Sequence, residues 1–93
     1  MIHAQYQNDE TNKTFSIHFA NVEIADPGFK AVNATYHLEN AINKAFDGTA
    51  RPEKVHVKIN DPHNYYLKLI AIAFVAYIRG LGYGHPDLTT ENF

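Results

Sequence analysis

The stretch YYLKLIAIAFVAYIRGLGYGH (residues 65–85) is apolar almost throughout, and Lys68 is its only charged side chain before Arg79. Its length and spacing predict a helix, and the glycines that follow Arg79 predict where this helix ends. Asp61 and Pro62 precede the stretch, and these residue types favour the N-cap and the first helical position. We therefore expect a helix that is apolar on nearly every side, and the fold must provide surfaces that cover it.

A helical wheel divides this helix into two stripes at about 100° per residue. The stripe that we expect to face the core is flanked by Leu67, Leu69 and Ile78, and it contains Tyr66, Ile70, Ala73, Phe74 and Tyr77. The opposite stripe contains Lys68, Ala71, Ile72, Val75 and Arg79. A helix on the surface of an isolated domain normally carries polar side chains across its outer stripe, so exposed aliphatic residues there need an explanation.

Three other segments alternate apolar and polar residues, which is typical of strands with one buried face. They are residues 2–7, 14–20 and 54–60, and the first two are joined by a polar loop that predicts a hairpin. The inward-facing residues of the second segment are Phe15, Ile17 and Phe19. Between the second and third segments, apolar residues at helical spacing predict another helix at 33–46, which Gly48 would end.

The expected order is therefore strand, strand, helix, strand, helix. Because every strand has one apolar face, we predict an α+β fold in two layers, with a three-stranded sheet and both helices on the same face. The sheet would consist of the N-terminal hairpin and a third strand placed after the crossover helix. We expect one domain over residues 1–93, in which residues 84–93 form a loosely ordered tail.

Composition excludes several classes of protein. Only 19% of the residues are charged, compared with about 25% in a typical domain, and the net charge is −2. The absence of cysteine excludes disulfides and thiolate metal sites and is compatible with a reducing cytosol. The N-terminus lacks the pattern of a signal peptide, and the longest uncharged apolar run, residues 69–78, is too short to span a bilayer. We therefore expect a cytoplasmic protein without membrane contact.

Histidines are the first residues that could carry chemistry. His3, His18 and His56 lie on the polar faces of the three expected strands and would project from the same side of the sheet. Neutral imidazoles can bind a transition metal or act as acid–base groups near neutral pH. The simpler interpretation is that histidine is tolerated on a solvated sheet face. Lys54 and Lys58 flank His56 and disfavour a bound cation.

The same sheet face offers a second alternative, weak nucleic-acid binding through Lys54, His56 and Lys58, with Arg51 nearby. A negative net charge and inward-facing aromatic residues argue against it, because RNA-binding sheets stack bases on outward aromatic side chains. The glycine-rich segment after Arg79 does not match a phosphate-binding loop, because it closes a helix instead of opening one.

The sequence thus favours a small interaction protein without catalytic residues or a cofactor. The predicted interface has an apolar centre with a basic rim and consists of Tyr65, Lys68, Ile72, Val75, Arg79 and Tyr83. The partner would be another protein or a second copy of the chain, most simply as a symmetric homodimer. Inhibitory or accessory factors of phages and mobile elements work in this way, for example inhibitors of a host defence complex, immunity proteins and antitoxins.

Overall fold

The computed structural model describes residues 1–22, 28–32, 36–47 and 51–93, and within these ranges the chain forms a mixed sheet of five strands and two helices. In chain order the elements are β1 (Ile2–Asp9), β2 (Thr14–Asn21), β3 (Lys30–Ala31), α1 (Tyr36–Phe46), β4 (Lys54–Ile59), α2 (Tyr65–Gly80) and β5 (Leu88–Glu91). The predicted α+β class is confirmed. The predicted three-stranded sheet is wrong in its detail, because β3 and β5 were not foreseen.

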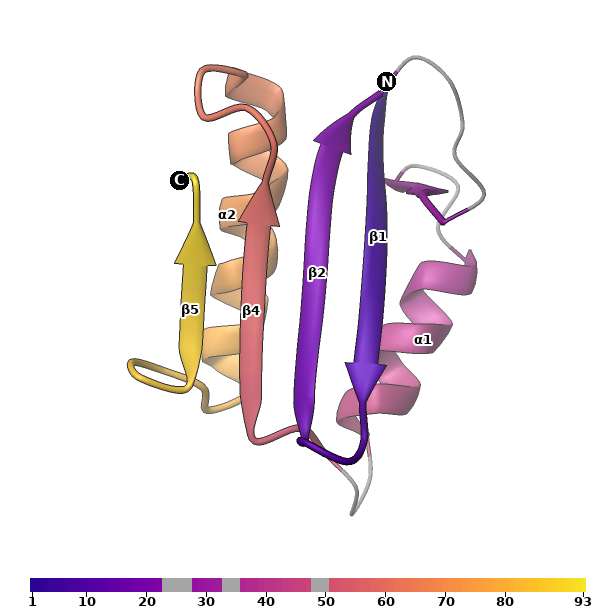
Figure 1. Cartoon of the computed structure of the whole chain (residues 1–93), viewed down its shortest axis with the longest axis vertical. Coiled ribbons are helices and arrows are strands. Elements are labelled where there is room, and N and C mark those ends of the chain that lie inside the picture. The colour runs from indigo at the N-terminus through magenta and orange to yellow at the C-terminus, as the bar shows by residue number, and fades with distance from the viewer. Residues whose placement is uncertain (23–27, 33–35, 48–50) are drawn as a thin grey trace.

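The strands lie in the order β3-β1-β2-β4-β5 (Figure 1). β1 pairs antiparallel with both β2 and β3, whereas β2–β4 and β4–β5 are parallel pairs. Each parallel pair needs a connection that crosses over the sheet, and α1 and α2 provide these connections. The chain is therefore an antiparallel hairpin extended by two β-α-β units.

The β1–β2 hairpin is closed by a polar turn that Asp9 organises. The Asp9 carboxylate accepts hydrogen bonds from the backbone N–H groups of Thr11 and Asn12 and from the Asn12 side chain. Lys13 then takes a positive φ of 53° before β2 begins. These bonds favour the ionised carboxylate, so they lower the pKa of Asp9, with the bond from the Asn12 backbone as the largest cause.

Both helices pack against the same face of the sheet. Phe46 at the end of α1 lies edge-on to Phe15, with ring centroids 5.1 Å apart, and Phe74 of α2 lies 5.6 Å from Phe19. Phe15 and Phe19 are two positions of the same face of β2, so the two helices share one layer. The start predicted for the first helix and its glycine cap fall on residues 33–35 and 48, outside the described residues, whereas its end at Phe46 agrees with α1.

The last ten residues are not the loose tail that we predicted. After α2 the chain turns back and adds β5 to the sheet, where Leu88 pairs with Val55 and Thr90 with Val57. Leu88 is buried against the core, and the Asn92 side chain donates a hydrogen bond to the Ile59 carbonyl at 3.1 Å. β5 therefore completes the second β-α-β unit.

Helix α2 is rotated by one residue step, about 100°, from the orientation that we predicted. Its buried residues are Leu67, Ala71, Val75 and Ile78. Each follows directly after a member of the stripe expected to be buried, namely Tyr66, Ile70, Phe74 and Tyr77. The buried set is wholly aliphatic, whereas the rejected set contains two phenol groups that need hydrogen-bond partners once water is removed. Ile70 and Phe74 remain half-buried, while Tyr66 and Tyr77 are exposed.

The start of α2 also differs from our prediction. Asn64 is the N-cap, and its side-chain oxygen accepts a hydrogen bond from the Leu67 N–H at 3.0 Å. Asp61 instead accepts a hydrogen bond from the His63 N–H in the preceding turn. The Asp61-Pro62 signal therefore marks the turn before the helix, and the helix itself begins three residues later, at Tyr65.

Two leucines on α2 test this rotation. Leu67 is fully buried and Leu69 is 45% exposed. We expect Leu67→Ala to lower the free energy of unfolding by about 2–5 kcal/mol, because it leaves a cavity in the core. Leu69→Ala should cost less than about 1 kcal/mol. Urea denaturation followed by circular dichroism measures both values, and equal losses for the two variants would contradict the observed rotation.

Candidate functional site

The outer surface of α2 is apolar and exposed. Side chains on this side of the helix carry no charge, and the large ones are Tyr65 (68% exposed), Tyr66 (72%), Leu69 (45%), Ile72 (48%) and Tyr77 (46%). Ala73 and Ala76 lie between them and are also exposed. We call these seven residues the outer α2 face. Single exposed hydrophobic residues are ordinary, whereas several large ones on one side of a helix are less common on a monomeric protein.

The borders of the outer α2 face are distinct. Lys68 and Arg79 lie along one edge, about 20° apart on the helical wheel. On the other edge, Tyr66 lines a hollow of about 330 Å³ together with Met1, which is 75% exposed and extends the apolar surface onto the start of β1. Tyr77 lines a second hollow, of about 260 Å³, with Phe46 and Asp47 at the end of α1.

Helix α1 provides an internal comparison. Its exposed side chains from residue 40 onward are polar, namely Asn40, Asn43 and Lys44, and Asp47 follows directly after it. The two helices cover the same sheet face, yet over residues 40–46, the part of α1 whose side chains the structure describes, no exposed side chain is aromatic or aliphatic.

The structure separates the six residues of the predicted interface. Tyr65, Ile72 and Arg79 are exposed, Lys68 is half-buried, and all four belong to α2. Val75 is only 6% exposed and packs in the core, so its predicted place on the surface is wrong. The reason is the rotation of α2. Sequence reasoning also placed Tyr66, Leu69 and Tyr77 in or beside the core, although they form much of the exposed surface.

Tyr83 is likewise buried, which corrects the prediction that it lies in the interface. Its ring meets Phe46 edge-on at 5.7 Å, and the Arg51 guanidinium lies 4.7 Å from its centroid. Its hydroxyl donates a hydrogen bond to the Pro52 carbonyl, and the Arg51 side chain also donates to the Leu81 carbonyl. Tyr83 therefore ties the segment that precedes β4 to the segment that follows α2.

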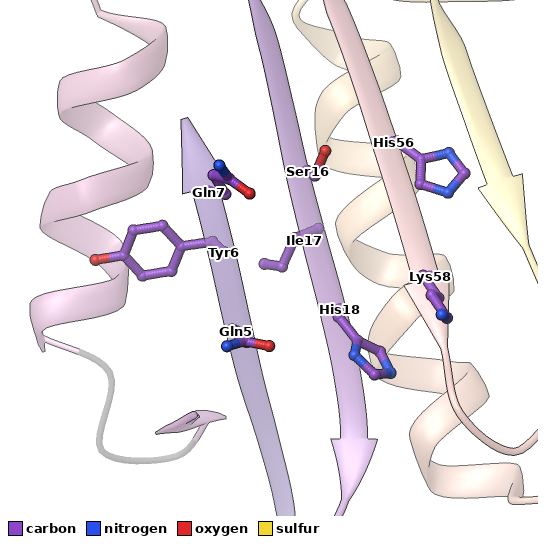
Figure 2. A pocket seen from close by; sticks show the side chains of 8 residues that line it. All are labelled: Gln5, Tyr6, Gln7, Ser16, Ile17, His18, His56 and Lys58. Carbon is purple, nitrogen blue, oxygen red and sulfur yellow. The ribbon is translucent and has the colours of Figure 1, made fainter. Parts of the chain in front are cut away.

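The opposite face of the sheet is polar and holds a hollow of about 450 Å³ (Figure 2). The strand register aligns two rows of side chains across it. One row runs Gln7–Ser16–His56–Thr89 and the other Gln5–His18–Lys58–Glu91. Sequence analysis singled out His18, His56 and Lys58 among these residues but missed the two on β5. The alternation of Leu88 and Thr90 with Thr89 and Glu91 is the signal for β5, but four residues are too few for periodicity to decide.

Glu91 neutralises much of this polar face. It lies 3.2 Å from Lys58 and 3.3 Å from His56, and the other ring nitrogen of His56 is 2.7 Å from the Thr89 hydroxyl. The hydrogen bond from Lys58 is the largest of the causes that lower the pKa of Glu91. The two side chains that β4 contributes to these rows, Lys58 and His56, are thus both engaged by β5, which leaves few free groups for a ligand.

The three histidines of the metal alternative lie on the polar side of the sheet but do not converge. Across the described parts of the chain, no three histidine, aspartate or glutamate side chains form a group that could hold a metal ion. His3 is buried, and its Nδ1 has no hydrogen-bond partner among the described residues. His18 packs edge-on against Phe29 with centroids 5.6 Å apart, so Phe29 shields its ring.

The cations of the nucleic-acid alternative are partly committed within the fold. Arg51 is held by Tyr83 and by the Leu81 carbonyl, and Lys58 is paired with Glu91. An electropositive surface that follows a phosphate backbone needs several unpaired cations. The structure gives this alternative little support, and it remains an untested prediction.

Comparison of the chain with protein-family models, with curated proteins and with solved structures gave no match. Neither helix in the described ranges has the length and hydropathy needed to cross a membrane. The functional argument therefore depends on the surfaces of the molecule itself.

The partly buried position of His18 predicts a pH-dependent stability. Burial, and secondarily the charge of Lys58, lower the pKa of His18 below the usual 6.5, while Glu91 opposes the shift. As the pH falls below about 6.5, His18 therefore takes up a proton in the unfolded chain before it does so in the folded chain. We expect this contribution to stability to be complete above that pH and to be lost as the pH falls through the folded-state pKa.

Urea midpoints at pH 7.5 and 5.5 measure this loss, and His18→Gln should make the dependence on pH weaker. Titration of the imidazole by NMR is the direct check. A folded-state pKa of 6.5 or higher for His18 would contradict the lowering of this pKa by burial and by the charge of Lys58.

Proposed function

We propose that the chain is a non-enzymatic interaction module that binds another protein, or a second copy of itself, through the outer α2 face. The observation that supports this proposal most strongly is the uncharged, exposed surface of α2, whereas the exposed side chains of α1 from residue 40 onward are polar. Water solvates such a surface poorly, so its burial against a partner is favourable.

The size of the outer α2 face is sufficient for binding. A fully exposed tyrosine presents about 150–250 Å², so the three partly exposed tyrosines together with Leu69 and Ile72 offer about 500 Å². At about 25 cal/mol per Å², burial of this area contributes roughly 12 kcal/mol before the entropic cost of association, which is of similar size. A specific but moderate affinity is therefore the expected outcome. Tyrosine and arginine, which occur here at Tyr65, Tyr66, Tyr77 and Arg79, are common at the energetic centres of interfaces.

The polar sheet face supports an acid–base or metal function less well. His56 and Lys58 are satisfied by Glu91 and Thr89, and the His18 ring is packed against Phe29. By contrast, the exposed tyrosine rings of α2 at residues 65 and 66 contact only each other among the ring contacts of the described residues. A protein that acts through binding alone works as an accessory or inhibitory factor, the class to which immunity proteins and antitoxins belong.

Ile72→Asp tests the proposal. Ile72 is 48% exposed and lies halfway along the outer α2 face, so a carboxylate there is tolerated by the fold but is costly in an apolar interface. We expect this variant to remain folded and to lose association, measured by light scattering for self-association and by affinity capture from the source cells for another partner. Gln7→Asp places the same new charge on the exposed polar sheet face and should leave association unchanged.

Val75→Asp distinguishes a surface position from a core position. It places a carboxylate at a buried position one helical turn from Ile72 and should unfold the chain. If Ile72→Asp and Gln7→Asp associate equally well, the outer α2 face is not the binding surface and the proposed function is wrong.

A further inference from the structure

The side chains of the outer α2 face change in size along the helix. Along the middle of the face, the N-terminal half carries the large residues Tyr65 and Leu69, whereas the C-terminal half carries Ala73, Ala76 and then Gly80. Tyr66 and Tyr77 lie along the edge opposite Lys68 and Arg79. The fold does not require these small residues. Both alanines are exposed, and a Cβ added at Gly80 would meet no atom within 4 Å. Space is therefore open above the C-terminal half of the helix.

This gradient makes the face complementary to itself when two copies run antiparallel. If a two-fold axis passes near Ile72 and Ala73, Leu69 of one copy lies level with Ala76 of the other, and Tyr65 lies level with Gly80. Along the middle of the face, large side chains then fill the space above small ones at both ends, as close packing requires. At the edge, Tyr66 of one copy lies near the level of Tyr77 of the other. In a parallel pair, large residues would meet large ones at one end and leave a gap at the other.

Resting on the proposed function, we infer that the partner of the outer α2 face is a second copy of this chain, packed with its α2 antiparallel. Two copies would bury about 1,000 Å² of apolar surface, which lies at the lower limit for a specific interface. The contact is the same on both copies, as a closed two-fold dimer requires. The polar residues Asn40 and Asn43 of α1 would lie at the rim, where solvent remains.

Charge opposes this arrangement, but only weakly. Lys68 and Arg79 lie on the same edge of α2, so the two-fold axis brings Lys68 of one copy near the level of Arg79 of the other. A like-charge pair on a solvated edge weakens association by about twofold. Loss of a well-packed large side chain from an interface costs more than about fivefold. Packing therefore decides the orientation, and the edge repulsion provides a test.

Reversal of this charge should strengthen the dimer. Lys68→Glu replaces two like-charge pairs with two opposite-charge pairs, and we expect the dissociation constant measured by sedimentation to fall by about fivefold or more at low salt. Lys54→Glu makes the same change of charge on β4 and is the matched control. This variant should leave the dissociation constant unchanged. A parallel dimer keeps Lys68 away from Arg79 of the partner, so an unchanged or higher dissociation constant for Lys68→Glu would overturn the antiparallel arrangement.

Cysteine cross-linking tests the geometry directly, because the native chain has no cysteine. Ala73→Cys lies beside the proposed axis and should link to itself under mild oxidation. Gly80→Cys should not link to itself, since its two copies would be about 20 Å apart along the helices, but it should link to Tyr65→Cys when the two variants are mixed. Self-linking of Gly80→Cys would overturn the proposal.

The two proposals fail separately. We choose 100 μM as the upper concentration, which is about a hundred times a micromolar dissociation constant. If sedimentation finds the native chain monomeric at this concentration, the proposed homodimer is wrong. In that case, loss of a captured protein in Ile72→Asp but not in Gln7→Asp would still support the outer α2 face as a docking surface for a different protein.

Discussion

The parallel pairing of β2 with β4 at the centre of the sheet is the constraint on which the rest of the structure depends. Phe15, Ile17, Val55 and Val57 face the helices from these two strands and are almost completely buried. Parallel neighbours cannot be joined by a hairpin, so the chain must cross over the sheet between them. The β4–β5 pair repeats this requirement with α2 as its connection. Both crossovers lie on one face, so the helical layer covers one side of the sheet and has an outside of its own.

Local periodicity predicted the elements in which apolar and polar residues alternate regularly along the chain. The alternation of Phe15, Ile17 and Phe19 with polar residues placed β2 correctly, and the same pattern in residues 54–60 placed β4. Two-residue β3 and four-residue β5 were missed, because their hydrogen-bond partners lie far away in the sequence and their own patterns are too short. The pairing partner of a strand is a tertiary property that a single short segment does not encode.

The apolar character of α2 was predicted from the sequence, but the rotation of the helix about its axis was predicted wrongly. An apolar helix with few charges gives a weak signal for orientation, because successive residues offer nearly equivalent stripes. Ala71 and Val75 face the sheet, and the hydroxyl groups of Tyr66 and Tyr77 remain in contact with water. Ile72, Tyr65 and Arg79 were placed correctly because they are exposed in either orientation. The partnership of Glu91 with Lys58 and His56 depends on β5, so sequence reasoning could not foresee it.

The sheet also limits the ways in which this molecule can assemble. The outer strand β5 is only four residues long, so it offers few free backbone groups to a strand from another molecule. On the other side, β3 pairs with β1 only at His3 and Ala4, so it covers only part of that edge. Short edge strands are a common protection against uncontrolled strand addition and fibril formation. The β5 edge has this protection, whereas beyond Ala4 the outer edge of β1 has no strand partner among the described residues.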